Sequence, residues 1–294
     1  MAPLGLALLL LPPAAAAVTG MHVDEEYCSG NLDQPQGPNN RSTQVRLCTQ
    51  FLDQLHNLSA QLKAQSPPLS LSVDAGTWSV CPPGSPPAPA PSSCFNLTYR
   101  GASKSIAEHI VDVADRAVLM DYDTKAQHAL GRAAPFLRYA DSIGKERSVV
   151  VGLAVAPPGA APTWWQTKDE LELQQLMAEL RPALSRHRSF GGFSVFDSTT
   201  WAQSSAAHPA PPGTAFHPTG AWYADHAMVL NRTRRGTWLA WAKSRALDRL
   251  FIAAHASNTA LIPVPGIEGS AAAAQEFCHF IQQAEAHGIS IELL

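Results

Sequence analysis

Residues 270–293 read SAAAAQEFCHFIQQAEAHGISIEL, and this stretch combines an amphipathic helix with the strand that follows it. Gly288 is a typical residue for ending a helix, and an apolar run begins directly after it at Ile289. A helix that passes into a short apolar strand through so tight a turn is typical of parallel βα units. The stretch therefore predicts an α/β protein.

The same alternation of short apolar strand and amphipathic helix recurs along the chain. Apolar residues at helical spacing predict further helices at 45–62 and 167–184. Eight parallel strands of this length close into a (β/α)8 TIM barrel, which is the fold that we predict. The strands are expected at residues 18–26, 69–74, 116–122, 148–155, 192–196, 226–230, 249–254 and 289–293.

Length and composition exclude several classes of protein. The chain has 294 residues, of which 46% are hydrophobic and 15% are charged, and its net charge is -3. This composition fits neither a disordered polyelectrolyte nor a basic nucleic-acid-binding protein. Beyond the N-terminus no run of about 18 apolar residues occurs, so we expect no stable membrane span after signal removal.

The N-terminus has the layout of a secretory signal. Residues 4–11 read LGLALLLL and are followed by the small residues of the run 14–17, as before a signal cleavage site. We therefore expect residues 1–17 to be a signal peptide and the protein to be secreted or to reside in the endomembrane lumen. The alternative is a start codon inside a longer reading frame, because the usual basic residues are missing.

Sequons and cysteines also indicate an oxidising compartment. N-x-S/T sequons predict glycosylation at Asn40, Asn57, Asn96 and Asn231. A disulfide bond is expected between Cys81 and Cys94, which flank a proline-rich loop that is unsuited to helix or strand. The alternative is that the cysteines are reduced and buried.

Residues 18–26, VTGMHVDEE, carry the densest group of ionisable side chains at a predicted strand end. Side chains alternate along a strand, so His22, Asp24 and Glu26 share one face. A carboxyl group close to another carboxyl group has a raised pKa, as a general acid at neutral pH requires. The alternative is an exposed loop of solvated acids after a short strand.

Residues 116–123, RAVLMDYD, are apolar until the end of the predicted strand. Met120 and Tyr122 face one way, and Asp123 lies at the tip. A tyrosine hydroxyl and a carboxylate together can stabilise a cationic reaction intermediate. The alternative is that Tyr122 is a core residue and Asp123 caps a helix.

These segments resemble motifs of the chitinase-type glycoside hydrolases of family 18. Residues 19–26 resemble the D-x-x-D-x-D-x-E strand of that family, residues 120–123 match its M-x-Y-D strand, and residues 191–196 resemble its last strand, G-G-x-x-x-W. The motifs also occur in the family's order. The resemblance implies a TIM barrel that cleaves β-linked N-acetylhexosamine polymers without a metal or organic cofactor.

The resemblance also implies roles for individual residues. Glu26 would be the general acid, Asp24 would orient the acetamido group of the substrate, and Tyr122 with Asp123 would support the intermediate. The chain departs from the pattern at Thr19 and His22, which replace the first two acids, and at Phe196, which replaces the tryptophan of the sugar site. Specificity for an acetamido group is therefore an open question.

The order of the strands is permuted relative to that family, whose acid-bearing strand is the fourth. Residues 18–205 would supply strands four to eight, residues 206–220 a linker rich in Ala, Pro and His, and residues 221–294 strands one to three. The chain would be a circular permutant or a window cut from a tandem array of barrels, possibly incomplete at its termini. In either case the barrel closes if residues 289–293 pair with residues 18–23.

Aromatic residues after strand ends are candidate platforms for sugar rings, because aromatic rings stack on the apolar faces of sugars. Each of these residues has core or loop packing as its alternative. The expected substrate-binding residues are His22, Asp74, Trp78, Met120, Trp164, Trp201 and His255.

The sequence predicts a hydrolase that acts on a β-linked glycan by acid catalysis from Glu26. One alternative is a non-catalytic carbohydrate-binding barrel, which the replacement of a signature acid by His22 favours. Another is an inactive fragment of a larger protein with tandem barrels. The expected partner is a glycan, and we expect no binding of nucleic acid.

Overall fold

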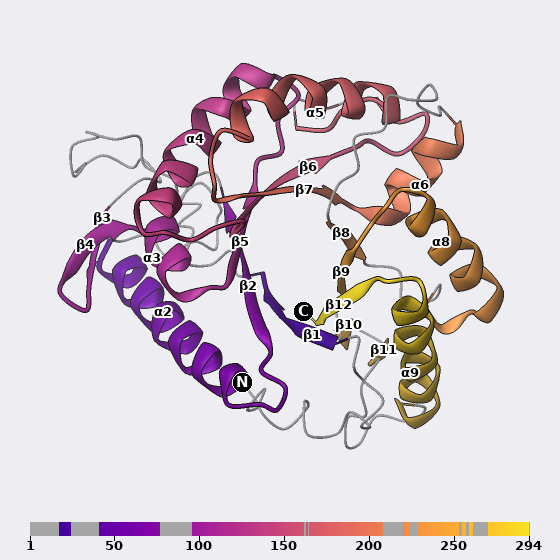
Figure 1. Cartoon of the computed structure of the whole chain (residues 1–294), viewed down its shortest axis with the longest axis horizontal. Coiled ribbons are helices and arrows are strands. Elements are labelled where there is room, and N and C mark those ends of the chain that lie inside the picture. The colour runs from indigo at the N-terminus through magenta and orange to yellow at the C-terminus, as the bar shows by residue number, and fades with distance from the viewer. Residues whose placement is uncertain are drawn as a thin grey trace.

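The chain forms a closed barrel of eight parallel strands surrounded by helices (Figure 1), as a computed structural model shows. Around the barrel the strands follow one another in the order β1, β2, β5, β6, β7, β8, β9 and β12. This arrangement confirms the predicted α/β barrel. The structure describes residues 18–24, 41–76, 96–161, 163, 165–207, 220–223, 229–252, 255–256, 259–260 and 270–293.

Strands and helices alternate along most of the chain. The barrel strands are β1 (Val18–Val23), β2 (Ser70–Gly76), β5 (Arg116–Met120), β6 (Val149–Ala154), β7 (Phe190–Phe196), β8 (Gly220–Tyr223), β9 (Arg249–Ile252) and β12 (Ser290–Leu293). The helices are α2 (Arg41–Lys63), α3 (Ile106–Val113), α4 (Ala126–Ser142), α5 (Glu170–Leu184), α6 (Ser198–Ala207), α8 (Arg232–Ser244) and α9 (Ser270–Ala286). Two short hairpins lie outside the barrel, formed by β3 (Asn96–Tyr99) with β4 (Ala102–Ser105) and by β10 (His255–Ala256) with β11 (Thr259–Ala260).

The first and last strands of the barrel close it. β1 pairs with β12 in parallel, with Val18 opposite Ile291 and Met21 opposite Leu293. On its other side β1 pairs with β2, so each of these strands has two neighbours. The expected pairing between residues 289–293 and 18–23 is therefore confirmed.

One predicted strand is wrong. The barrel strand expected at residues 226–230 lies instead at β8, and Val229 and Leu230 are helical. Gly220 begins β8 close to the ring of Phe251, where a Cβ atom would lie 3.2 Å from the ring. A four-residue strand that contains such a glycine has too little periodicity to be recognised. The predicted linker at 206–220 accordingly overlaps the end of α6 and the start of β8.

The main hydrophobic core lies between the outside of the barrel and the helices. Val149, Val151 and Leu153 of β6 belong to it, and α2 adds the buried side chains of Leu52 and Leu55. Burying one such side chain contributes about 1.5 to 3 kcal/mol to folding. The apolar periodicity that predicted the helix at 45–62 therefore marks the face that packs on the barrel.

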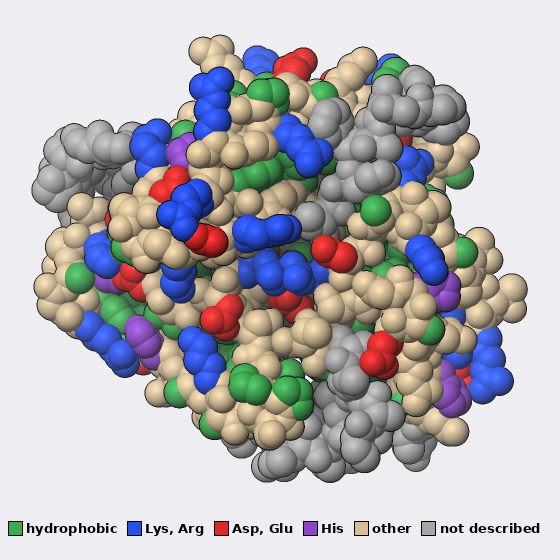
Figure 2. Space-filling view, viewed as in Figure 1, with side chains coloured by type: hydrophobic (Ala, Val, Ile, Leu, Met, Phe, Trp, Pro, Cys, Tyr) green, Lys and Arg blue, Asp and Glu red, His purple; other side chains and the backbone are tan. Residues whose placement is uncertain are grey.

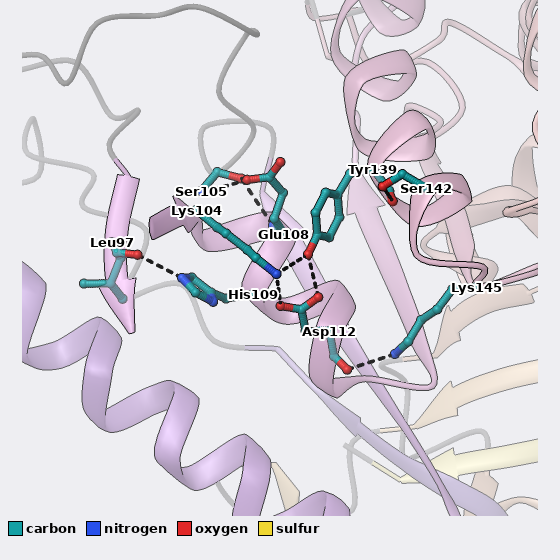
Figure 3. Close-up of polar contacts among 9 residues, drawn as sticks. All are labelled: Leu97, Lys104, Ser105, Glu108, His109, Asp112, Tyr139, Ser142 and Lys145. Atoms are coloured by element: carbon teal, nitrogen blue, oxygen red, sulfur yellow. Dashed lines mark hydrogen bonds and ion pairs between the residues drawn. The ribbon is translucent and has the colours of Figure 1, made fainter. Parts of the chain in front are cut away.

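A cluster of polar side chains fixes the β3–β4 hairpin and helix α4 to helix α3 (Figure 3). Lys104 Nζ donates to Asp112 Oδ2 at 2.8 Å and to the hydroxyl of Tyr139, and that hydroxyl donates to Asp112 Oδ1 at 2.6 Å. His109 Nε2 lies 2.9 Å from the carbonyl oxygen of Leu97 on β3. The members satisfy one another, so the cluster serves to hold three elements together.

The surface is charged without a strong bias of sign. Figure 2 shows Lys, Arg, Asp and Glu side chains close together near the centre of the face that it presents. Among the described residues, no helix is both long enough and apolar enough to cross a membrane.

Candidate functional site

The barrel interior contains a polar group of side chains that alternation along the strands turns inward. Among the described residues, Val118, Val150 and Phe251 form a hydrophobic cluster separate from the main core, and alternation places all three inside the barrel. The remaining inward positions of β1, β2, β9 and β12 are mostly polar. A polar interior is unusual, because a TIM barrel is normally filled by branched apolar side chains.

His22 on β1 lies at the centre of this polar group. Its Nδ1 atom is 2.6 Å from Ser72 Oγ, and its Nε2 atom is 2.9 Å from Asp74 Oδ2, both on β2. The imidazole ring also packs against the ring of Phe251, with a distance of 4.3 Å between the centroids. Because His22 and Asp74 are 2% exposed, neither can be a direct ligand for a substrate in this conformation.

Glu292 on β12 continues the polar group toward the amino-terminal end of the barrel. The hydroxyl of Ser72 donates to Glu292 Oε2. Arg116 Nη1 donates to Glu292 Oε1 at 2.7 Å, and Arg249 Nε lies 2.8 Å from the same oxygen. Glu292 is buried, so the two guanidinium groups provide the opposite charge that a buried carboxylate requires.

The environment of His22 favours its protonated form. Burial lowers its pKa, but the carboxylate of Asp74, through its charge and its hydrogen bond, and the charges of Glu292 and Asp24 raise it. The net effect is a pKa above the ordinary value of 6.5. We refer below to His22, Ser72, Asp74 and Glu292, with Arg116 and Arg249, as the interior network.

Asp24 lies at the carboxyl-terminal end of the barrel, where TIM-barrel enzymes carry their active sites. It follows β1 directly and is exposed, and alternation places it on the same face as His22. The strand ends at Val23, shorter than the predicted range 18–26. Glu26, the predicted general acid, lies outside the described residues.

Three aromatic side chains contact one another at the same end of the barrel. The ring centroid of Tyr122, after β5, is 5.7 Å from that of Phe196 at the end of β7 and 6.2 Å from that of Trp165, in the segment after β6. Phe196 is 37% exposed, which is unusual for a phenylalanine. We call Tyr122, Trp165 and Phe196 the aromatic group; Tyr122 is a predicted site residue, Trp165 is one of the aromatic residues after predicted strand ends, and Phe196 takes the place of the family's sugar-site tryptophan.

Asp123, which was expected to support the reaction intermediate, is bound elsewhere. Arg132 of α4 donates from Nη2 to Asp123 Oδ2 at 2.7 Å and from Nε to Asp121 Oδ1 at 2.7 Å. The backbone N–H of Lys125 donates to Asp123 Oδ1 at 2.9 Å. Both acids therefore turn toward the helix while Tyr122, between them, turns inward. The expectation that Asp123 faces a substrate is not met.

The two acids that share Arg132 have opposite pKa shifts. Burial raises the pKa of Asp121 to about 7, although Arg132 opposes this effect. Burial also acts to raise the pKa of Asp123, but the hydrogen bonds from Arg132 and Lys125 outweigh it and lower the pKa. Asp121 Oδ2 is buried and has no hydrogen-bond partner in the part of the chain that the structure describes, which agrees with the poor solvation of this carboxylate.

Trp201 does not form part of the barrel mouth. Its side chain is 0% exposed, and its indole N–H donates to the buried carboxylate of Glu170 at the start of α5. Its ring also lies edge-on to Trp241 of α8, with 4.9 Å between the centroids. A fully enclosed indole offers no face to a sugar, so the expectation for Trp201 is wrong and its alternative, core packing, holds.

The structure places the other predicted residues as follows. Met120 is half-buried at the end of β5, and the backbone of His255 lies in β10. Asn57, Asn96 and Asn231 are exposed, and Asn231 also caps α8. Cys48 is disulfide-bonded, and Cys278 is a free cysteine. The predicted residues that lie outside the described part of the chain are Glu26, Asn40, Trp78, Cys81, Cys94 and Trp164.

Sequence reasoning missed Ser72, Glu292, Arg116 and Arg249. Two signals were present: residues 70–74, SLSVD, and 290–293, SIEL, alternate polar and apolar residues, as strands with one polar face do. In the part of the chain that the structure describes, no group of His, Cys, Asp and Glu residues is arranged to hold a metal ion.

Comparison of the chain with models of protein families, with characterised proteins and with solved structures found no match.

Proposed function

We propose that the protein is a glycoside hydrolase-like barrel that acts on a β-linked glycan at the carboxyl-terminal end of its strands. One observation carries the proposal: an exposed acid, Asp24, and an aromatic group with an exposed ring, Phe196, occur at the same end of one barrel. A sugar ring needs an aromatic surface for its apolar face, and cleavage of its glycosidic bond needs carboxyl groups.

The positions of the strands add support. β1 and β7 are four strands apart in the closed ring of eight, so Asp24 and Phe196 belong to opposite sides of the barrel. Tyr122 and Trp165 follow β5 and β6, which lie between them. A glycan that spans the end of the barrel would therefore contact the aromatic group on one side and the acids after β1 on the other.

The proposed chemistry is general acid catalysis. Glu26 follows Asp24 at the spacing that the resemblance to family 18 assigns to the proton donor and its neighbouring carboxylate. Such a donor protonates the oxygen of the leaving sugar, while a second carboxylate stabilises the positive charge that develops on the ring. The same proposal places the protein in a secretory compartment, with Asn57, Asn96 and Asn231 as glycosylation sites on exposed positions.

The test is the hydrolysis of chitooligosaccharides and of a panel of other β-linked glycans by wild type, Glu26→Gln and Glu25→Gln. Glu25→Gln is the matched control, because it removes the adjacent carboxyl group, to which the resemblance to family 18 gives no role. We expect Glu26→Gln to lower the rate about 10²- to 10⁴-fold and the control to retain activity. Equal rates for wild type and Glu26→Gln would exclude Glu26 from the reaction.

A non-catalytic carbohydrate-binding barrel is the second candidate, and the position of Asp123 favours it. Arg132 holds this carboxylate on the helix side, so the residue that would support an intermediate does not face the barrel interior. Calorimetric titration of the same glycans distinguishes the two functions. Binding that needs Phe196, with no hydrolysis by any variant, would select the carbohydrate-binding function.

A further inference from the structure

The interior network and Asp24 together contain ionisable groups of both signs, and the charges of this larger set balance only if His22 is protonated. Arg116 and Arg249 are positive, and Glu292, Asp74 and Asp24 are negative when ionised. With a neutral imidazole, two positive charges face three negative ones. With an imidazolium, three positive charges meet three negative ones.

The hydrogen bonds lead to the same conclusion independently. The single proton of the Ser72 hydroxyl goes to Glu292, so Ser72 Oγ can only accept from His22 Nδ1, which lies 2.6 Å away. Asp74 as a carboxylate can only accept from His22 Nε2, 2.9 Å away. Both ring nitrogens therefore donate, which requires an imidazolium.

We propose that His22 is a positioning residue, a buried imidazolium that holds Asp24 as a carboxylate and so leaves proton donation at the barrel mouth to another acid. Its part in catalysis rests on the proposed function; its effect on the charge of Asp24 does not. His22 lies on β1, two positions before Asp24, which directly follows the strand, and the charges of the two groups act on each other.

The two strands that pair with β1, and the residue that follows β1, support this charge state. β2 contributes Ser72 and Asp74, β12 contributes Glu292, and β1 itself contributes Asp24. The charges of Arg116 on β5 and Arg249 on β9 oppose it, but both are already paired with Glu292. The ring of Phe251 covers one side of the imidazole and restricts the access of water.

The charge state of Asp24 also limits the chemistry that is possible at the carboxyl-terminal end of the barrel. A carboxylate that stays ionised cannot donate a proton, but it can stabilise positive charge on a sugar ring or orient a polar substituent of the substrate. Two neighbouring acids can then have different roles, because the environment of one keeps it ionised while the other keeps the proton that it donates.

The experiment follows the ionisation of both groups by NMR in the full chain without substrate. At pH 6.5, the ring ¹⁵N shifts of His22 in wild type are expected to be mainly those of a doubly protonated imidazole. Side-chain ¹³C shifts of Asp24 are then compared between wild type, His22→Gln and the matched control His279→Gln, which removes a histidine from helix α9. In His22→Gln the titration midpoint of Asp24 should rise by about one pH unit, and in the control it should not move.

Either NMR result can overturn the inference. A His22 ring that is mainly neutral at pH 6.5 in wild type contradicts it even if His22→Gln does not fold, and an unchanged Asp24 midpoint in a folded His22→Gln protein contradicts it directly. If wild type hydrolyses a glycan, the acidic limb of its pH–rate profile should move to higher pH in His22→Gln by the same amount as the Asp24 midpoint. If both NMR results are as expected but wild type hydrolyses no glycan, the proposed hydrolase is rejected. The proposed charge state of His22 and its effect on Asp24 then still stand.

Discussion

Strands β1 and β5 are each followed directly by an aspartate, Asp24 and Asp121, but these two acids lie in different surroundings. After β1, Asp24 continues the inward face of His22. After β5, Asp121 and Asp123 turn outward to Arg132, and Tyr122 takes the inward position. A shift of one residue in the alternation decides whether an acid contributes to the barrel mouth or to the helical layer.

The surroundings of β1 and of β5 compensate buried charge in different ways. Around β1, the neighbouring strands supply Ser72, Asp74 and Glu292, so the compensation lies inside the barrel. Around β5, a single guanidinium from α4 serves two carboxylates. The first arrangement keeps a charged group next to the mouth, whereas the second anchors a loop to a helix.

The largest effect on stability is expected from breaking the network inside the barrel. Glu292→Ala leaves Arg116 and Arg249 without their shared carboxylate and should lower the free energy of unfolding by about 3 to 5 kcal/mol. Urea denaturation measures the loss. Glu285→Ala on the exposed face of α9 is the control and should change stability by less than about 0.5 kcal/mol. Similar values for both variants would show that the network is not coupled to folding.

The stability of the protein should depend on pH through Asp121 and Asp123, the two acids that Arg132 binds. The folded protein holds the Asp121 proton up to a pKa of about 7, whereas an unfolded chain releases it near 4, so this group makes the protein less stable as pH rises between these values. Asp123 acts in the opposite sense, because its lowered pKa adds stability that is lost as pH falls through the acidic range.

Asp121→Asn should remove the first of these contributions. Relative to wild type, its free energy of unfolding should be more favourable at pH 8 than at pH 4.5, by up to about 3 kcal/mol. Urea denaturation at the two pH values measures the difference. A difference that does not change with pH would contradict the raised pKa of Asp121.

A smaller effect should follow from removing the hydroxyl that links the two halves of the interior network. Ser72→Ala deprives Glu292 of a donor and His22 of an acceptor, at a cost of about 2 kcal/mol. Ser290→Ala, on the neighbouring β12, removes a partly exposed hydroxyl and is the control. Thermal unfolding of the two variants side by side measures the difference. Equal melting temperatures would show that the Ser72 hydroxyl does not stabilise the interior network.

The smallest effect on stability is expected at the aromatic group. Phe196→Ala loses a ring contact with Tyr122 and should cost about 0.5 to 1.5 kcal/mol. If the ring of Phe196 contacts a glycan, Phe196→Ala should lose more free energy of glycan binding than free energy of unfolding. Calorimetric titration compares the affinities, and unchanged binding would remove Phe196 from the proposed site.

The sequence predicted the fold well because the barrel depends on repeated patterns. Apolar runs located seven of the eight strands, and the pairing of the first with the last followed from the requirement that a barrel close. It misplaced the strand that became Gly220–Tyr223, since four residues give almost no periodicity.

The candidate site was less predictable for a physical reason. Alternation correctly grouped His22 with Asp24, but the partners Ser72 and Glu292 come from strands 50 and 270 positions away from His22, and only barrel closure brings them together. The role of Asp123 depended on Arg132, a helical residue that no local pattern links to a strand end. Trp201 followed a strand but was enclosed by helices, which the sequence alone did not indicate.

The central claim is that a glycan is hydrolysed at the carboxyl-terminal end of the barrel, where it would contact Asp24 on one side and the aromatic group on the other. The most direct test is the rate at which Asp24→Asn hydrolyses whichever β-linked glycan wild type cleaves fastest, measured at constant pH with Glu25→Gln alongside. The account predicts a loss of about 10²-fold or more for Asp24→Asn and near wild-type rates for Glu25→Gln. Equal rates for wild type and Asp24→Asn, or no hydrolysis of any glycan by wild type, would contradict it.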